Sequence, residues 1–332
     1  MELQFATLDV FTSTRMQGNP LAVVSVPAAL QDRLPQAAKQ KIAREFNLSE
    51  TVFLHEAAAD GNRSERRVDI FTTEQEIPFA GHPTIGTAVL ARYYLHPHVD
   101  TLVTKAGPIG LVPQDGRRIR AKIPHNVHLH ANTLADVIIG SGSGTGEEDY
   151  PGLSPVPEIR AAELAAPVFS VVRGMTFVLV RLPSLGLLGR VTEAARLDFA
   201  GLPKPLLDEA WRDSFVCRYY YVDVDPDKED GEGEEGREGA RHIRTRMVEL
   251  GFEDPATGSA ASALASYLTL KEGRKGEGTN RFRLTQGVEM GRRSDISVDT
   301  TTRETSDGVE LVDLWLGGTA VVVMKGSLTV DV

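Results

Sequence analysis

Short segments rich in β-branched and aromatic residues recur through the first 124 residues, and Gly, Pro or Asp bounds each of them. Such segments predict strands, here LQFATLDVF, LAVVSV, TVFLHE, RVDIFT, TLVTKAG, LVPQ and RIRAKI. The segments after Pro83 and Pro255 differ, because small or apolar residues occupy every helical face. A helix without a polar face is buried on all sides. The pattern therefore predicts strands around a single buried helix.

The two apolar helices belong to an internal repeat. When PFAGHPTIGTAVLARYYL is laid over GFEDPATGSAASALASYLTL with His82 on Asp254, the prolines and glycines that follow also coincide. Two more pairs of segments keep the same order, GNPLAVV with GMTFVLV and TKAGPIG with TQGVEMG. The chain therefore predicts two copies of one α+β fold, a first half over 1–124 and a second over 125–319, with a cleft at the seam between them.

Two low-complexity segments interrupt the second half. Residues 140–149, GSGSGTGEED, lack the Gly-Lys-Ser/Thr of a P-loop and predict a flexible linker. Residues 223–240 are acidic, and a charged, glycine-rich segment of this kind predicts a solvated, mobile loop, with a docking segment for a basic partner as the less favoured interpretation. This segment carries most of the net charge of -10, so the rest of the chain suggests no nucleic acid and no anionic membrane as partner.

The compartment is indicated by two features. No apolar segment reaches the roughly 18 to 20 residues of a membrane span, and the opening MELQFATLDV alternates like a strand. A lone cysteine, Cys217, forms no internal disulfide. Both features predict a cytoplasmic protein.

The two matched helix starts carry the candidate chemistry. Asp254 suits an N-cap, and Pro255 suits the first helical position, where no N–H is needed. His82 at the matching place is a poor cap, so capping alone does not explain the pair. An acid and an imidazole that face each other across the cleft predict proton transfer. Helix N-termini favour anions, which predicts a small carboxylic acid as the ligand.

Small and hydroxyl residues follow each helix start. Gly86 and Gly258 would let the backbone approach a ligand, and the Thr87 and Ser259 hydroxyls would bind its carboxylate. Close helix packing explains either glycine equally well. Ser259 is disfavoured as a hydrolase nucleophile, because it lacks the GxSxG turn between strand and helix.

A pair of histidines stands apart from these motifs. His128 and His130 in HNVHLH lie on one face of a predicted strand, a spacing that suits a metal ion. No acidic or cysteine residue that could be a third ligand lies nearby in the sequence, so a pair of surface histidines is favoured and no metal site is expected.

Five segments together resemble a known family. DVFTSTRMQGNPLAVV, REFNLSETVFL, FTTEQEIPFAGHPTIGTA, GFEDPATGSAA and QGVEMGR are similar to the PhzF-like isomerases of phenazine biosynthesis, relatives of diaminopimelate epimerase. The resemblance implies the diaminopimelate epimerase-like fold, with two pseudo-symmetric halves, each a β-barrel-like sheet around a central helix. It also implies that a last strand at about 320–332 returns to the first half, and that the protein is a homodimer.

The resemblance also assigns the site. It implies that Glu50 is the general acid/base and that His82 and Asp254 complete the catalytic set. The residues expected to contact the substrate are Asn19, Gly81, Thr84, Gly86, Thr257, Gly258 and Ser259. The implied activity is a proton shift on a small unsaturated or amino carboxylic acid, without metal or organic cofactor.

Differences between this chain and the related sequence patterns bear on the mechanism and on the substrate. Where the epimerases carry a pair of cysteines, this chain has Ala80 and Thr257, so a two-thiol mechanism is excluded. The family's frequent Gly-Arg-Pro-Ser and Phe-Thr-Pro are replaced by GRRS at 291–294 and FTT at 71–73, which bears on the substrate. Two alternatives stay open: a non-catalytic protein that binds a small carboxylate or a partner, and a racemase or epimerase that does not use thiols.

Overall fold

The computed structural model describes residues 1–57, 61–139, 150–192, 196–225, 239–249, 251–272, 278–306 and 308–331. The chain forms two compact units. The first comprises Met1–Pro124, Arg292–Ile296 and Trp315–Val332, and the second comprises His125–Gly291 and Ser297–Leu314. Among the described residues, no helix is long and apolar enough to cross a membrane.

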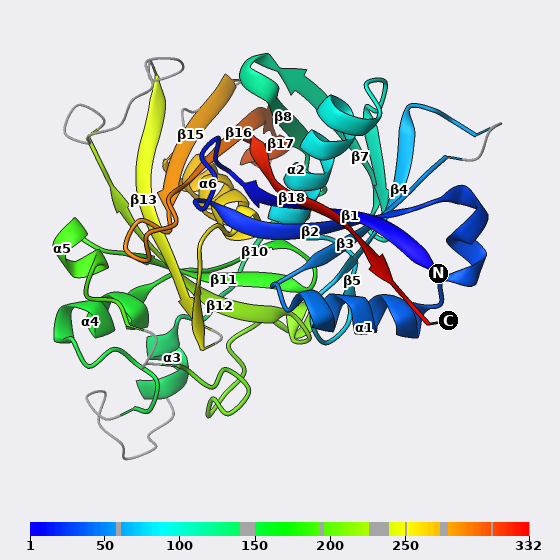
Figure 1. The fold of residues 1–332 in the computed structure, drawn as a ribbon. Helices are drawn as coiled ribbons and strands as arrows, with labels where there is room; N and C mark the ends of the chain where they lie inside the picture. The colour runs from blue at the N-terminus through cyan, green and yellow to red at the C-terminus, as the bar shows by residue number, and fades with distance from the viewer. Residues whose placement is uncertain are drawn as a thin grey trace. The chain divides into compact units, whose positions relative to one another are not determined.

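The first unit is mostly strands. They are β1 (Glu2–Val10), β2 (Asn19–Val26), β3 (Thr51–His55), β4 (Glu65–Phe71), β5 (Glu76–Ile77), β6 (Thr101–Thr104), β7 (Gly107–Gln114), β8 (Arg118–Lys122) and β18 (Ala320–Thr329). The seven strands predicted for this half are confirmed. β1 pairs antiparallel with β2 on one edge and with β18 on the other, and β18, red in Figure 1, runs beside the blue β1. The predicted return of the last strand to the first half agrees with this pairing.

One buried helix lies at the centre of the first unit. All ten residues of α2 (Gly81–Leu90) are buried, and the helix contacts β1, β2, β3, β8 and β18. The π-helical turn η2 (Ala91–Leu95) continues it. The predicted central helix is therefore confirmed, and its lack of a polar face is explained by strands on several sides.

Gly86 makes this packing possible. A Cβ added there would lie 2.6 Å from a methyl group of Leu21 on β2 and 2.6 Å from one of Val10 on β1. The glycine is thus required where helix and sheet come closest, and packing alone accounts for it. Its predicted contact with the substrate stays a prediction.

Replacing Gly86 by Ala is expected to lower the free energy of unfolding by about 1–3 kcal/mol, because the added methyl overpacks a closed core. Urea denaturation would measure this. Gly110→Ala is the matched control, since no atom lies within 4 Å of a Cβ built there. An unchanged stability in Gly86→Ala would contradict the close packing.

The first unit also contains a helix that the pattern of strands did not predict. α1 (Gln36–Phe46) buries Ala38, Ile42 and Ala43 in a core with residues of β1, β2 and β3. The expectation of a single helix per half is therefore wrong. Two short 3-10 helices, η1 (Ala28–Arg33) and η3 (Asp115–Arg117), complete the unit.

The second unit repeats the same design. Its strands are β9 (His128–Leu129), β10 (Val168–Val172), β11 (Met175–Arg181), β12 (Phe215–Asp223), β13 (Ala240–Glu249), β14 (Phe252–Asp254) and β15 (Gly278–Gln286), and β16 (Ser294–Thr305) and β17 (Gly308–Gly318) contribute to both units. Its helices are α3 (Leu134–Ile138), α4 (Pro157–Ala165), α5 (Leu185–Leu188), α6 (Gly258–Glu272) and the 3-10 helix η6 (Glu209–Trp211). As α2 does in the first unit, α6 packs on strands of its own unit, here β10, β11 and β15.

The order and sense of the strand pairs match between the units. β1–β2 and β10–β11 are antiparallel, β2–β3 and β11–β12 are parallel, and β3–β4 and β12–β13 are antiparallel. Each unit then adds a short antiparallel strand, the central helix, and a parallel partner, β6 on β4 and β15 on β13. The predicted pseudo-symmetry of the fold is therefore confirmed.

The predicted insertions lie largely outside the described residues. Residues 140–149 are not described at all, and 226–238 of the acidic segment are not described either. Of the segment's described residues, Asp223 is the last residue of β12 and Ala240 is the first residue of β13.

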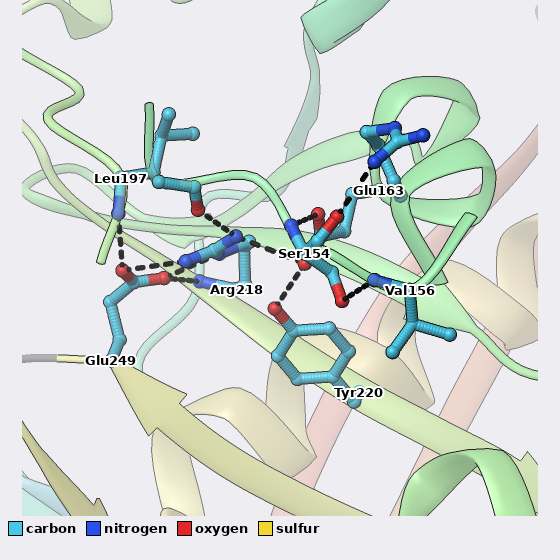
Figure 2. Close-up of polar contacts among 9 residues, drawn as sticks. Ser154, Val156, Glu163, Leu197, Arg218, Tyr220 and Glu249 are labelled. Atoms are coloured by element: carbon cyan, nitrogen blue, oxygen red, sulfur yellow. Dashed lines mark hydrogen bonds and ion pairs between the residues drawn. The ribbon is translucent and has the colours of Figure 1, made fainter. Parts of the chain in front are cut away.

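A buried ionic network fixes helix α4 of the second unit to the strands β12 and β13. Figure 2 shows the guanidinium of Arg218, on β12, between the carboxylates of Glu163 and Glu249. The nitrogen to oxygen distances are 3.0 and 2.7 Å, and none of the three side chains is more than 3% exposed. Tyr220 donates a hydrogen bond to Glu163, and the Ser154 backbone N–H donates another. Every charge in the network is paired, as burial requires.

Candidate active site

Glu50 reaches its place through a left-handed turn. Asn47 ends α1 with φ at 51° and donates its N–H to the Ala43 carbonyl, a conformation that asparagine tolerates. The chain then enters β3, and Glu50 is the residue directly before that strand. Its side chain is 17% exposed, and its Oε2 atom is buried without a hydrogen bond from the described residues.

His82 lies beside this carboxyl group. It is the second residue of α2 and 5% exposed, and its Nε2 is 3.5 Å from Glu50 Oε2. The Asn19 side-chain amide, at the start of β2, lies 3.4 Å from His82 Nδ1. The Asn19 amide nitrogen donates a hydrogen bond to His82 Nδ1. The proton of the neutral imidazole ring therefore lies on Nε2, which faces Glu50. The structure thus brings together three residues predicted from separate motifs.

Burial changes the acidity of Glu50. Loss of solvation raises the pKa of its carboxyl group to about 7, against a smaller opposing effect of a hydrogen bond from Ser49. Near neutral pH the group therefore exists in both protonation states. A carboxyl with a pKa near the working pH is suited to take a proton and to return it.

The raised pKa predicts a stability effect. Below the ordinary pKa of 4.5, Glu50 is protonated in both the folded and the unfolded chain, so it does not lower the free energy of unfolding. As the pH rises from 4.5 to 7, Glu50 ionises in the unfolded chain only, and the folded state is destabilised relative to it. Glu50→Gln removes this cost. We expect the variant to be more stable than the parent by about 2–3 kcal/mol at pH 8 and to show little difference near pH 4.5, by urea denaturation. An equal difference at both pH values would contradict the assigned pKa.

Asp254 lies in a strand and does not cap the helix. It is the last residue of β14 and pairs with Met247 of β13, while α6 begins four residues later at Gly258. The expectation that Asp254 is an N-cap and Pro255 the first helical residue is therefore wrong, because the strand ladder extends the chain through Asp254. The Thr257 hydroxyl donates a 2.5 Å hydrogen bond to Asp254 Oδ2.

A buried glutamine that the sequence analysis did not select holds this turn. Gln286, at the end of β15, is 0% exposed. Its Nε2 donates to the Asp254 carbonyl at 2.8 Å and to the Thr257 hydroxyl at 3.0 Å. Its Oε1 accepts from the Thr257 N–H at 3.2 Å and from the Tyr219 hydroxyl at 2.9 Å. The only sequence signal for Gln286 was its place in the repeated segment TQGVEMG.

The remaining predicted contact residues lie at the two helix starts. Gly81 is the first residue of α2, and the Thr84 hydroxyl donates to the Ala80 carbonyl, so that hydroxyl is engaged inside the helix. Gly258 and Ser259 are the first two residues of α6; Gly258 is buried and Ser259 is partly exposed. Their contacts with a substrate, and the predicted approach of His82 to Asp254, stay predictions.

The two helix starts carry no thiols. Ala80 directly precedes α2 and Thr257 directly precedes α6, the places where the related epimerases have cysteines by the alignment. The lone Cys217 is fully buried on β12, and burial raises the pKa of its thiol well above the usual value. A two-thiol mechanism is not available to this chain.

The segment 291–294, Gly-Arg-Arg-Ser in place of the family's Gly-Arg-Pro-Ser, has a structural role. Arg292 donates to Asp9 Oδ1 at 2.8 Å and to the Gly18 carbonyl at 2.9 Å, which holds the segment leading to Asn19. The Arg293 backbone N–H donates to Gln17 Oε1 at 2.7 Å, a hydrogen bond that a proline at this position could not make.

Comparison with known proteins identifies the family and the fold. Residues 8–133 and 234–326 match the family model described as phenazine biosynthesis-like protein, PhzC-PhzF. The chain is 33% identical to an uncharacterized isomerase of Mesorhizobium japonicum, over 96% of each chain, and 29% identical to the trans-2,3-dihydro-3-hydroxyanthranilate isomerase of Pseudomonas fluorescens, over 87% of each. A crystal structure of a PhzF-family protein from Bacillus anthracis covers 99% of this chain and is itself covered completely, with a TM-score of 0.66 at 20% identity. The chain therefore belongs to the phenazine biosynthesis-like family and is an isomerase with the diaminopimelate epimerase-like fold.

Proposed function

We propose that this isomerase moves a proton between two carbons of a small unsaturated or amino carboxylic acid, and that Glu50 is the group that moves it. One observation supports this above the others: the Oε2 atom of Glu50 is buried beside His82 Nε2, and burial raises the pKa of the carboxyl group to about 7. A carboxyl group of this kind suits a reaction in which one residue acts first as base and then as acid.

In the proposed reaction, the Glu50 carboxylate takes a proton from a carbon next to a double bond. The C–H electrons enter the conjugated system, and the protonated carboxyl returns the proton to a different carbon, so composition and charge are unchanged. His82, with Nε2–H toward Glu50, steadies the carboxylate and polarises the substrate. Asp254, held by Thr257 and Gln286, contributes the second set of contacts.

Deuterium incorporation tests the proposal. The protein is incubated in D2O with trans-2,3-dihydro-3-hydroxyanthranilate, the compound in the name of the Pseudomonas fluorescens relative, and with a panel of small unsaturated and amino acids. We expect proton NMR to show solvent deuterium at one carbon of one compound, together with a shifted double bond. Exchange at a saturated α-carbon with inversion would indicate a racemase instead, and exchange in none of the compounds would count against this substrate class.

A further inference from the structure

We propose that His128, His130 and Asp208 form a binding site for one divalent transition-metal ion of the Zn²⁺ type. All three lie in the second unit, and the inference does not depend on the proposed function. The sequence offered no third ligand, but the fold supplies Asp208, which lies 78 positions after His130 along the chain. The expectation of two surface histidines is wrong for His130, whose side chain is 0% exposed.

The potential ligand atoms already converge. His128 and His130 lie at the start of β9 and directly after it, on one face, and Asp208 directly precedes η6. One potential ligand atom from each residue lies within 4.8 Å of the other two. His128 Nε2 is 2.6 Å and His130 Nδ1 is 3.6 Å from Asp208 Oδ2. Ligands bonded at about 2.0–2.2 Å to a tetrahedral ion lie about 3.4 Å apart, so sub-ångström shifts would accommodate one.

The surroundings of His130 resemble those of a metal ligand. Its Nε2 lies 2.9 Å from the Ser170 hydroxyl, which in turn is 2.5 Å from the Thr176 hydroxyl. A hydrogen bond on the far ring nitrogen is what orients histidine ligands in metal sites. Trp211 stacks on the His128 ring, with centroids 5.1 Å apart and an interplanar angle of 8°. Both imidazoles are therefore held in fixed orientations.

Two existing hydrogen bonds compete with the ion. His128 Nε2 and Asp208 Oδ2 are hydrogen-bonded at 2.6 Å, and an ion held by both atoms would replace that bond. The Asp208 backbone N–H donates to His130 Nδ1 at 3.1 Å, and coordination would take that lone pair. Both hydrogen bonds are weak beside the bonds that zinc forms with imidazole and carboxylate ligands.

The donor set and its exposure indicate the class of ion. Two imidazoles and one carboxylate suit Zn²⁺, Co²⁺, Ni²⁺ or Cu²⁺, and not Mg²⁺ or Ca²⁺, which prefer oxygen ligands. The side chains of His128 and Asp208 are 36% and 35% exposed, so an ion can enter from solvent and complete its coordination with water.

Calorimetric titration of the full, chelator-treated chain with ZnCl₂ near pH 7.5 tests the site. We expect one equivalent to bind with a micromolar or lower dissociation constant. His128→Gln and Asp208→Asn should each weaken binding at least about tenfold, and Ser170→Ala about tenfold through the loss of ligand orientation. His98→Gln, which removes an exposed imidazole elsewhere, should bind as the parent does.

A second readout localises the ion. Cu²⁺ should quench the fluorescence of Trp211, and the quenching should disappear in Trp211→Phe, in which Trp315 remains. Circular dichroism of each variant confirms that it is folded, and His128→Gln changes a side chain that is partly exposed. Absence of a stoichiometric zinc site in the parent would overturn the inference. So would affinity that survives in both His128→Gln and Asp208→Asn, or MgCl₂ that binds as tightly as ZnCl₂.

Discussion

Glu50→Gln is expected to lower turnover by about 10²- to 10⁴-fold, the usual contribution of a general acid or base. Gln has nearly the same shape as Glu but neither takes nor gives up a proton, so the variant should fold and still bind the substrate. The measurement is the rate of deuterium incorporation by proton NMR in D2O, on whichever compound the parent turns over. The parent's rate should also follow an apparent pKa near 7, the value that burial gives Glu50.

Glu56→Gln is the matched control for this prediction. Glu56 directly follows β3, at the opposite end of that strand from Glu50, and it pairs with His96 on a partly exposed surface. The same chemical change there should leave turnover within about twofold, since surface ion pairs contribute little. A Glu50→Gln protein that keeps the parent's rate would remove Glu50 from the reaction and would leave His82 or Asp254 as the group that moves the proton.

Arg218→Met is expected to have the largest effect on stability, a loss of about 3–5 kcal/mol in the free energy of unfolding. Methionine fills a similar volume, but Glu163 and Glu249 would remain buried without the guanidinium that lies between them in Figure 2. Urea denaturation followed by tryptophan fluorescence reports on this unit, because Trp211 belongs to it and is 7% exposed.

An exposed ion pair in the same unit provides the comparison. Arg303 lies 2.8 Å from Glu310, and both side chains are more than half exposed. Arg303→Met should change stability by at most about 0.5 kcal/mol, because solvent screens such pairs. If the two variants lost similar stability, burial would not be the source of the effect at Arg218.

The sequence predicted most of the fold because its signals are local in the chain and are repeated in both halves. Short segments rich in β-branched and aromatic residues, bounded by Gly, Pro or Asp, marked the strands of the first half, and uniformly apolar segments marked the central helices of both units. The sequence analysis did not predict α1, because the sequence signals for this helix are weak. Pro35 precedes the helix without a side-chain cap, and only four of its eleven residues are buried. The prediction that Asp254 caps the helix was wrong because Asp254 belongs to a strand. The pairing of β14 with β13 depends on tertiary contacts, which local sequence preferences do not predict.

Less of the candidate site than of the fold could be predicted from the sequence. Glu50 came from a family motif, because the burial that raises its pKa is produced by tertiary packing. Gln286 and Tyr219 belong to strands far from Asp254 in the sequence, and only the folded chain brings the glutamine to the turn. The sequence analysis also missed Asp208 as a third metal ligand, because only the folded chain brings it to His128 and His130.

The pairing of β1 with β18 has a consequence for biosynthesis. Residues 320–329 complete the edge of β1, so the first unit cannot close its sheet until residue 329 has left the ribosome. The second unit needs the chain only as far as Leu314, through its parts of β16 and β17. We therefore expect the N-terminal half to wait during synthesis with an open edge on β1, which invites intermolecular strand pairing.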